Sequence, residues 1–300
     1  WVAARAAAAA GKPYVITPHG TFMEHWRYRS AKKRAYRALL LRDVLPGAAA
    51  MHVLSEREQQ ACRDAGITCP LAVIPNGLAE GAFATARGMQ RSRWCGDPGR
   101  KYLVYLGRLW HEKGLDLLVE AWAGARRGGQ LADWDLVVAG ADFRGYRAEL
   151  ERRIGELQVA SSVRLVGEVH GEDKAALLRF ADAFVQPSRS EALSMSLLEA
   201  MAAGLPCVYT TGCNLPSLAE CGGGIETAVS AADLQQGLLR VAGLAGEERA
   251  AMGQRGRRLA LQHYSEQAVM QQLERLYADI LEWAAPAAAG PPLLRGELAG

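Results

Sequence analysis

The chain has 300 residues, and its 50% hydrophobic and 22% charged content is that of an ordinary globular protein with room for two domains. A formal net charge of +3 is too small to indicate a nucleic-acid partner. The six cysteines lack C-x-x-C spacing, which argues against a zinc site or disulfide framework and favours a reducing cytoplasm. No apolar run approaches the roughly 20 residues that span a bilayer, and the Ala-rich opening is too weakly hydrophobic for a signal peptide.

The first part of the chain alternates helices with short apolar strands. After an Ala-rich helix, the pattern predicts strands at 14–17, 50–55 and 71–74 and a helix at 56–65. The chain opens on Trp1 in mid-helix, and three strands are too few for a complete doubly wound domain. We therefore expect an N-terminal piece to be missing.

A histidine follows the first predicted strand. His19 lies in a Pro-His-Gly loop, at the strand end where open α/β sheets place ligand groups. Histidine exchanges a proton near neutral pH, so His19 is a candidate catalytic residue. The alternative is a loop histidine that makes one structural hydrogen bond.

A strongly basic helix is predicted between Arg27 and Arg42. It contains no acidic residue, and apolar side chains interleave its lysines and arginines. Such a helix can rest on anionic lipid or gather an anionic acceptor. The alternative is a solvated helix face.

A second domain is expected after a linker at 84–100, which has no apolar periodicity. The strand predicted at 102–106 is followed by Gly107 and Arg108, and Lys113 lies near the start of the next helix. Two cations past a strand end can grip a diphosphate, arginine as a fork and lysine as a point charge. The alternative is a pair of helix-start charges without a ligand.

Strands and helices then alternate regularly, which implies a parallel sheet with right-handed crossovers. Further strands are predicted at 134–139, 163–166, 183–186 and 206–210. No G-x-G-x-x-G follows a strand, so a dinucleotide-binding oxidoreductase is poorly supported. Helices are predicted at 145–158, 172–181, 233–242, 247–261 and 265–283, and a disordered tail at 286–300.

The segment 187–204 combines two carboxylates with a change from strand to loop to helix. Glu191 is expected on the loop, and Glu199 one to two turns into the helix. The amides of Leu193 and Ser194 are then free at a helix N-terminus, where an anion can bind. The alternative is that Glu191 caps the helix and Glu199 is a solvated charge.

Four motifs resemble the retaining glycosyltransferases of family 4. They are P-H-G, V-I-P-N-G, L-G-R-L-x-x-E-K-G-L-D and S-E-A-L-S-M-S-L-L-E-A-M-A-A-G-L-P. The resemblance runs from about Pro13 to Leu281, and the third and fourth motifs are specific together although each is weak alone. It implies an α/β fold of GT-B type, with two Rossmann-like domains facing across a cleft and the first incomplete at its N-terminus.

The resemblance also implies a domain plan. Residues 1–98 would hold a partial acceptor-side domain and the linker, and residues 99–264 the nucleotide-sugar-binding domain. A C-terminal helix at 265–285 would cross back to the first domain, before the tail at 286–300. The expected location is the cytoplasm, with peripheral contact to the inner face of the cell membrane through Arg27–Arg42.

The implied activity is the transfer of a sugar from a nucleotide diphosphate-sugar donor to a glycan or lipid-linked acceptor, with retention of configuration. No cofactor is implied, because cations of the protein would replace the metal ion on the diphosphate. Glu191 is not expected to be a nucleophile. The residues implied are Gly107, Arg108 and Lys113 for the diphosphate, His19 and Glu191 for the donor sugar and catalysis, Ala192, Leu193 and Ser194 for sugar and phosphate, Glu199 for the ribose, and Val166 and Gly167 for the base.

One position departs from the family pattern. The residue after the first glutamate is often glycine in the family, whereas this chain has Ala192. Alanine restricts positive φ but is small, so we expect binding to survive. Two other functions stay open: a nucleotide-sugar epimerase, which would need acid/base groups besides His19, and a non-catalytic membrane-associated fragment. The donor nucleotide, its sugar and the acceptor cannot be read from the sequence.

Overall fold

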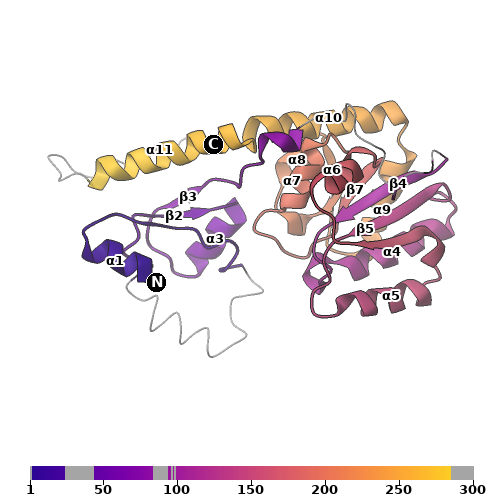
Figure 1. Ribbon diagram of the computed structural model, residues 1–300, viewed down its shortest axis with the longest axis horizontal. Helices are drawn as coiled ribbons and strands as arrows, with labels where there is room; N and C mark the ends of the chain where they lie inside the picture. Colours follow the sequence, from indigo (N-terminus) through magenta and orange to yellow (C-terminus); the bar gives the residue numbers. More distant parts are fainter. Residues whose placement is uncertain (1, 24–43, 84–93, 96, 98, 285–300) are drawn as a thin grey trace. The chain divides into compact units, whose positions relative to one another are not determined.

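The computed structural model describes residues 2–23, 44–83, 94–95, 97 and 99–284 (Figure 1). The predicted basic helix, most of the predicted linker and the tail lie outside these residues. The chain divides into two compact units, one made of Trp1–Gly77 and Gln267–Gly300 and the other of Leu78–Glu266. Among the described residues, no helix combines the length and apolar character needed to cross a bilayer.

The first unit contains a small parallel sheet in the order β1-β2-β3. The three strands are β1 (Val15–Ile16), β2 (Ala50–Val53) and β3 (Leu71–Val73), which are the three strands that the sequence predicts. Among the described residues of this unit, the helices that accompany them are α1 (Val2–Ala9), α3 (Glu56–Asp64) and α11 (Glu266–Ala284). Ser55 caps α3, because its hydroxyl accepts a hydrogen bond from the Glu58 amide.

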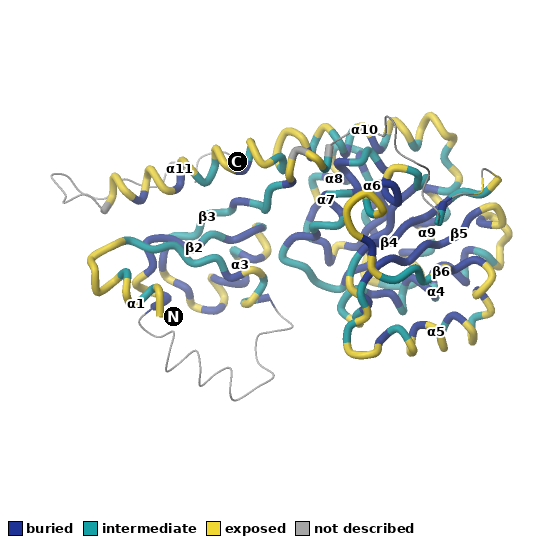
Figure 2. The backbone as a smooth tube through the Cα atoms, in the orientation of Figure 1, coloured by how far each residue is buried: buried dark blue, intermediate teal, exposed yellow. Residues whose placement is uncertain are grey.

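Each face of this sheet packs against a different helix. Successive side chains of a strand point to opposite faces, so Met51 of β2 packs with Cys62 of α3, whereas its neighbour Ala50 packs with α11. The apolar side chains of α11 that meet the sheet recur with helical spacing, and the other side of this helix is exposed (Figure 2). They are Val269, Leu273, Leu276 and Ile280.

The second unit is a six-stranded parallel sheet in the order β6-β5-β4-β7-β8-β9. The chain order of its strands is therefore 3-2-1-4-5-6, the doubly wound arrangement. The strands are β4 (Lys101–Leu106), β5 (Trp134–Ala139), β6 (Val163–Gly167), β7 (Ala183–Gln186), β8 (Cys207–Thr210) and β9 (Gly224–Thr227). The helices are α4 (Leu115–Arg127), α5 (Tyr146–Glu156), α6 (Gly171–Arg179), α7 (Met195–Ala202), α8 (Pro216–Glu220), α9 (Ala231–Gly243) and α10 (Gly246–His263). Short 3-10 turns occur at η2 (Glu80–Phe83), η3 (His111–Lys113), η4 (Ala160–Ser162) and η5 (Thr211–Cys213).

The core of this unit explains why its central strands read as nearly continuous apolar runs. Every residue of β5 and β7 is buried, because helices cover both faces of a parallel sheet. Trp122 of α4 is fully buried, and its indole N–H donates to the Ser162 hydroxyl over 3.1 Å. This large core side chain therefore also has its polar atom satisfied.

The order reversal lies between β4 and β7, and the loops that follow these two strands are fastened together. The Arg189 guanidinium donates to both carboxylate oxygens of Asp116, at 2.8 and 2.6 Å, and to the His111 carbonyl at 2.7 Å. The Arg189 amide donates to the Glu112 carbonyl at 2.9 Å. This clamp fixes the loop after β7 against the turn after β4, where ligands bind in doubly wound sheets.

The ends of β4 and β5 approach so closely that glycine is required between them. A Cβ on Gly140 would lie 1.8 Å from the Gly107 carbonyl oxygen, and the φ of Gly140 is +154°. We expect Gly140→Ala to lower the free energy of unfolding by about 1–3 kcal/mol, the usual cost of overpacking. Urea unfolding measures the change, and Gly155→Ala in α5 is the control, because no atom lies within 4 Å of its added Cβ. Equal stability of the two variants would contradict the close approach.

The Arg189–Asp116 clamp predicts a pH dependence of stability. Burial raises the pKa of the Asp116 carboxyl, but the hydrogen bonds and charge of Arg189 outweigh burial and leave the pKa below its ordinary value. The stabilisation is therefore complete above the ordinary pKa of aspartate and is lost as the pH falls through the lower pKa of the folded state. We expect Asp116→Asn to lose about 1–3 kcal/mol of unfolding free energy at pH 7.

The same measurement is repeated at lower pH. The difference between Asp116→Asn and the wild type should shrink as the pH drops from about 5 to 3. Glu151→Gln serves as the control, because Glu151 pairs with Arg147 on an exposed helix surface and should change stability by less than about 0.5 kcal/mol. A difference that stays constant down to pH 3 would rule out this electrostatic role.

Candidate functional site

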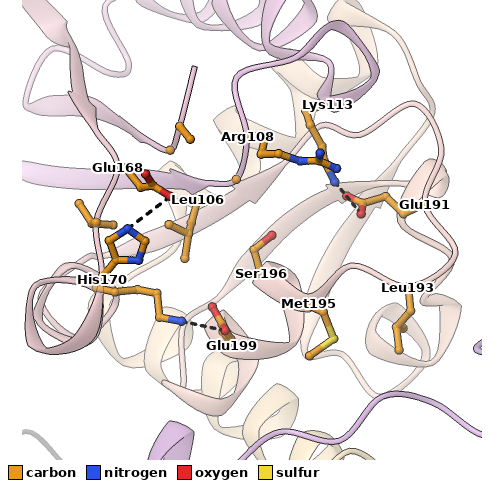
Figure 3. A pocket seen from close by; sticks show the side chains of 15 residues that line it. Leu106, Arg108, Lys113, Glu168, His170, Glu191, Leu193, Met195, Ser196 and Glu199 are labelled. Atoms are coloured by element: carbon orange, nitrogen blue, oxygen red, sulfur yellow. Dashed lines mark hydrogen bonds and ion pairs between the residues drawn. The ribbon is translucent and has the colours of Figure 1, made fainter. Parts of the chain in front are cut away.

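A pocket of about 370 Å³ opens at the carboxyl ends of the strands of the second unit (Figure 3). Residues after β4, β5 and β6 form one part of its lining, and the loop after β7 with the first turns of α7 forms the rest. All of its lining residues belong to the second unit. The pocket therefore lies where the strand order reverses, which is the expected ligand position of a doubly wound sheet.

Close backbone contact brings the two main walls of the pocket together. Gly114 ends the turn η3 with a φ of +67°, and a Cβ there would lie 2.0 Å from the Pro187 carbonyl oxygen. On the other side of the β7 loop, the Glu191 amide donates to the Gly212 carbonyl at 2.8 Å. The loop that carries Glu191 is thus held from both sides.

Lys113 and Glu191 form an ion pair in the pocket. The Lys113 Nζ lies 2.8 Å from Glu191 Oε2, and the two side chains are 21% and 10% exposed. The other carboxylate oxygen, Oε1, accepts hydrogen bonds from the Ser188 hydroxyl at 2.6 Å and the Gln186 amide at 3.3 Å. The structure therefore joins the residue expected to bind a diphosphate to the residue expected to contact the sugar.

A second ion pair lies on another part of the lining. Lys174 Nζ of α6 lies 3.0 Å from Glu199 Oε1 of α7. Figure 3 shows Glu199 apart from the Lys113–Glu191 pair, with Ser196 between them in that view. Each of the two predicted carboxylates is thus held by a lysine, and the second lysine was not predicted.

Arg108 supplies a cation that has no carboxylate partner among the described residues. Its guanidinium lies 5.5 Å from the centre of the Phe143 ring, which itself meets Trp110 edge-on at 5.0 Å. The Arg108 carbonyl accepts a hydrogen bond from the buried Tyr105 hydroxyl at 3.0 Å. The side chain points toward the Lys113–Glu191 pair in Figure 3, so it is available to an anion there.

The start of α7 contributes further lining residues. Leu193 lines the pocket, whereas Ala192 and Ser194 are not among its lining residues. Ser194 is the N-cap residue and is almost fully buried. Ala192 is not among the described non-glycine residues with positive φ, so alanine fits the backbone at this departure from the family pattern. Beyond Ser194, Met195 and Ser196 reach the pocket.

The predicted base-binding residues end just short of the pocket. Val166 and Gly167 lie at the end of β6, and the Gly167 carbonyl accepts a hydrogen bond from the Gly140 amide at 2.7 Å. The lining begins with the next three residues, 168–170. Within them, the His170 ring lies 3.3 Å from the Glu168 carboxylate on the exposed rim.

His19 lies in the first unit, on the turn after β1. It is exposed and has a φ of +47°, a left-handed conformation that is uncommon for residues other than glycine. The Gly20 amide next to it donates to Glu58, which holds the turn. The contact of His19 with a donor sugar stays a prediction.

Several lining residues were missed at the sequence level. Gly140 and Ala141 directly follow a predicted strand. Because ligands bind at the carboxyl ends of the strands in open α/β sheets, these two residues could have been predicted. Lys174 and Ser196 carry no such signal, because a lysine on a helix and a serine in an apolar segment are common. Within the described part of the chain, no group of three or more His, Cys, Asp or Glu side chains is arranged to hold a metal ion.

Family models match both units of the chain. The model described as glycosyl transferases group 1 matches residues 90–259, and a glycosyl transferase 4-like domain matches residues 1–77. Among curated relatives, a GDP-mannose:cellobiosyl-diphosphopolyprenol alpha-mannosyltransferase of Xanthomonas oryzae is 31% identical over 65% of this chain and 48% of its own length. The lipopolysaccharide core biosynthesis mannosyltransferase LpsB of Rhizobium meliloti is 33% identical over 38% of this chain and 32% of its own length. The chain therefore spans about half the length of the first of these relatives and about a third of the length of the second.

Solved structures share the fold. Anabaena HepE in complex with UDP and glucose has a TM-score of 0.77 at 21% identity, covering 92% of this chain and 74% of its own. Sucrose-phosphate synthase from Thermosynechococcus elongatus has a TM-score of 0.76 at 21% identity, covering 90% and 68%. These neighbours confirm the expected α/β fold class of GT-B type. Because the group 1 match covers more than half of the sequence, the chain belongs to the glycosyl transferases group 1 family.

Proposed function

We propose that this protein transfers a sugar from a nucleotide diphosphate-sugar donor to a glycan or lipid-linked acceptor. The observation that carries the proposal is the pocket at the strand-order reversal, with Arg108 and Lys113 on one part of its lining and Glu199 on another. Cations suit a diphosphate, and a carboxylate suits the paired hydroxyls of a ribose. A nucleotide diphosphate would satisfy both parts at once.

The formal charges of the pocket lining support a role for both cations. Arg108, Lys113 and Lys174 are balanced in formal charge by Glu168, Glu191 and Glu199. The pocket lining as a whole therefore offers no net positive charge to a diphosphate. Positive charge is concentrated next to β4, where the Arg108 guanidinium and the Lys113 ammonium lie. The ammonium has three N–H donors, so it can hold Glu191 and a phosphate oxygen together.

The proposed chemistry is cleavage of the bond between the anomeric carbon and the diphosphate oxygen. Negative charge grows on the departing diphosphate, and fixed cations stabilise that charge more than they stabilise the bound donor. We propose that Arg108 and Lys113 do this without a metal ion. Retention then follows from attack by the acceptor on the face that the diphosphate leaves, with a diphosphate oxygen accepting the proton of the acceptor hydroxyl.

Glu191 has a supporting part in this proposal. Its two carboxylate oxygens already accept from Lys113, Ser188 and Gln186, so it is poorly placed to act as a nucleophile. We propose that it contacts the donor sugar and holds Lys113 in position. His19 would contact the same sugar from the first unit.

Lys113→Ala tests the donor site. We expect binding of the best nucleoside diphosphate among UDP, GDP and ADP to fall by at least tenfold, because a charged hydrogen bond contributes about 1.5–3 kcal/mol. Isothermal titration calorimetry measures the affinity, and turnover of the matching nucleotide sugar should fall with it. Glu199→Ala should weaken the same affinity through the ribose.

Lys101→Ala is the matched control for this test. Lys101 also pairs with a carboxylate, Asp133, at 2.8 Å, but it does not line the pocket. Its removal should leave nucleotide affinity unchanged. Unaltered binding by Lys113→Ala would remove the basis for the proposal, whichever nucleotide is used.

We also propose that the protein works in the cytoplasm at the inner face of the cell membrane. The support is the basic segment 27–42, together with a mannosyltransferase relative whose name specifies a diphosphopolyprenol acceptor. Reversing Lys32, Lys33 and Arg34 to Glu should abolish flotation with vesicles rich in phosphatidylglycerol. Reversal of Arg127, Arg147 and Arg152 matches the charge change elsewhere and should have little effect; equal flotation of both variants would refute membrane docking by this segment.

A further inference from the structure

A glutamine lies beneath the pocket at the end of β7 and connects two of its lining residues. Gln186 is fully buried. Its amide nitrogen donates to the Ser188 hydroxyl at 2.9 Å and to Glu191 Oε1 at 3.3 Å. Its carbonyl oxygen accepts from the Ser196 hydroxyl at 2.9 Å. One buried side chain thus touches the polar groups of both the β7 loop and α7.

The charge of Glu191 fixes the direction of every bond in this network. An ionised carboxylate only accepts hydrogen bonds, so the NH2 group of Gln186 must face it, and the carbonyl must face Ser196. Ser196 then has to donate its only hydroxyl proton to Gln186. Its remaining lone pairs are left for the pocket, where Ser196 can accept a hydrogen bond but cannot give one.

A competing partner for the Ser196 proton is too distant to change this assignment. The Ser194 hydroxyl oxygen lies 3.5 Å from that of Ser196, well beyond the usual 2.7–2.8 Å of such bonds. The Gln186 carbonyl at 2.9 Å is the stronger acceptor. Ser194 is also buried, so it leaves the pocket side of Ser196 to a ligand.

We propose that Gln186 is a positioning residue that holds Glu191 and orients Ser196 to accept a hydrogen bond from a hydroxyl group of the donor's sugar. The inference rests on the proposed function. Phosphate oxygens only accept hydrogen bonds, so the lone pairs of Ser196 disfavour them and favour a hydroxyl. The donor sugar and the ribose both carry hydroxyls. Ser196 shares the hydrogen-bond partner Gln186 with Glu191, the residue proposed to contact the sugar, so we assign its hydroxyl partner to the sugar.

Gln186→Met tests the positioning role, because methionine has a similar volume and no amide. The probes are UDP-glucose, GDP-mannose and ADP-glucose, with UDP, GDP and ADP as the sugar-free partners. For the nucleotide sugar that the wild type binds most tightly, we expect the Kd to rise at least tenfold. The Kd of the matching nucleoside diphosphate should change less than twofold. Gln60→Met is the control, since Gln60 donates to Asp64 on an exposed surface of the first unit.

A double-mutant cycle shows whether Gln186 acts through Ser196. Ser196→Ala alone should reproduce most of the loss in nucleotide-sugar affinity, and Gln186→Met should add little to it. Fully additive losses would overturn the orientation of Ser196 by Gln186. Equal losses for the nucleotide sugar and the nucleoside diphosphate would overturn the assignment to the sugar and place the hydroxyl on the ribose.

Gln186→Glu gives a pH signature that a packing role would not produce. A second carboxylate beside Glu191 should share a proton with it, so nucleotide-sugar affinity should be poor at pH 8 and recover toward pH 5, about where carboxylate pairs take up a proton. Burial and Glu191 raise the pKa values of Tyr105 and Cys213, so these two neighbours stay neutral in this range. A flat pH profile would contradict the contact.

The outcomes separate the two proposals. If the wild type binds none of the six nucleotides, the proposed function fails and the Gln186 inference falls with it. If the wild type binds a nucleotide sugar and Gln186→Met binds it equally well, only the inference fails. Thermal unfolding of each variant shows that the comparison is made on folded protein.

Discussion

The pocket depends on the close approach of the loops that follow β4 and β7. At Gly114 there is no space for a side chain against the Pro187 carbonyl, and Arg189 ties the same two segments through Asp116. The strands β4 and β7 are neighbours in the sheet, on opposite sides of the order reversal, so the loops that follow them start side by side. The approach is what allows Lys113, from one loop, to reach Glu191, on the other.

The two lysine–glutamate pairs set the electrostatics of the pocket. Attraction at these distances is worth several kcal/mol, but much of it is offset by loss of hydration, so the pairs add little net stability. The pairs instead contribute preorganisation. Each carboxylate is held in position by its lysine, so its side chain loses less conformational freedom when a ligand binds. Arg108, resting on Phe143 without a carboxylate partner among the described residues, is the cation that a diphosphate meets without breaking an ion pair.

Sequence patterns predicted the strands of both sheets except β9, where they indicated only a glycine-rich turn, and they predicted the position of the reactive groups but not their partners. Apolar runs identify parallel strands, and polar residues after them mark the ligand edge of the sheet, as for Arg108 and Glu191. The strand order cannot be derived from regular alternation, and it is the order that brings α6 beside α7 and Lys174 to Glu199. The lining after β6 begins one residue beyond the predicted Gly167, whose carbonyl accepts a hydrogen bond from the Gly140 amide. The basic segment lies outside the described residues, so its helix stays a prediction.

Gln186 shows why a buried polar residue at the end of a central strand is informative. Every other residue of β7 is apolar, and an unpaired amide at this depth would cost about 1–3 kcal/mol. Both ends of the amide are satisfied, yet all three partners belong to the loop and helix of the pocket rather than to the sheet. An apolar side chain would pack as well against the core and leave Ser188, Glu191 and Ser196 without a common partner. The glutamine therefore orients polar side chains of the pocket, whereas packing of β7 in the core requires only a side chain of suitable volume.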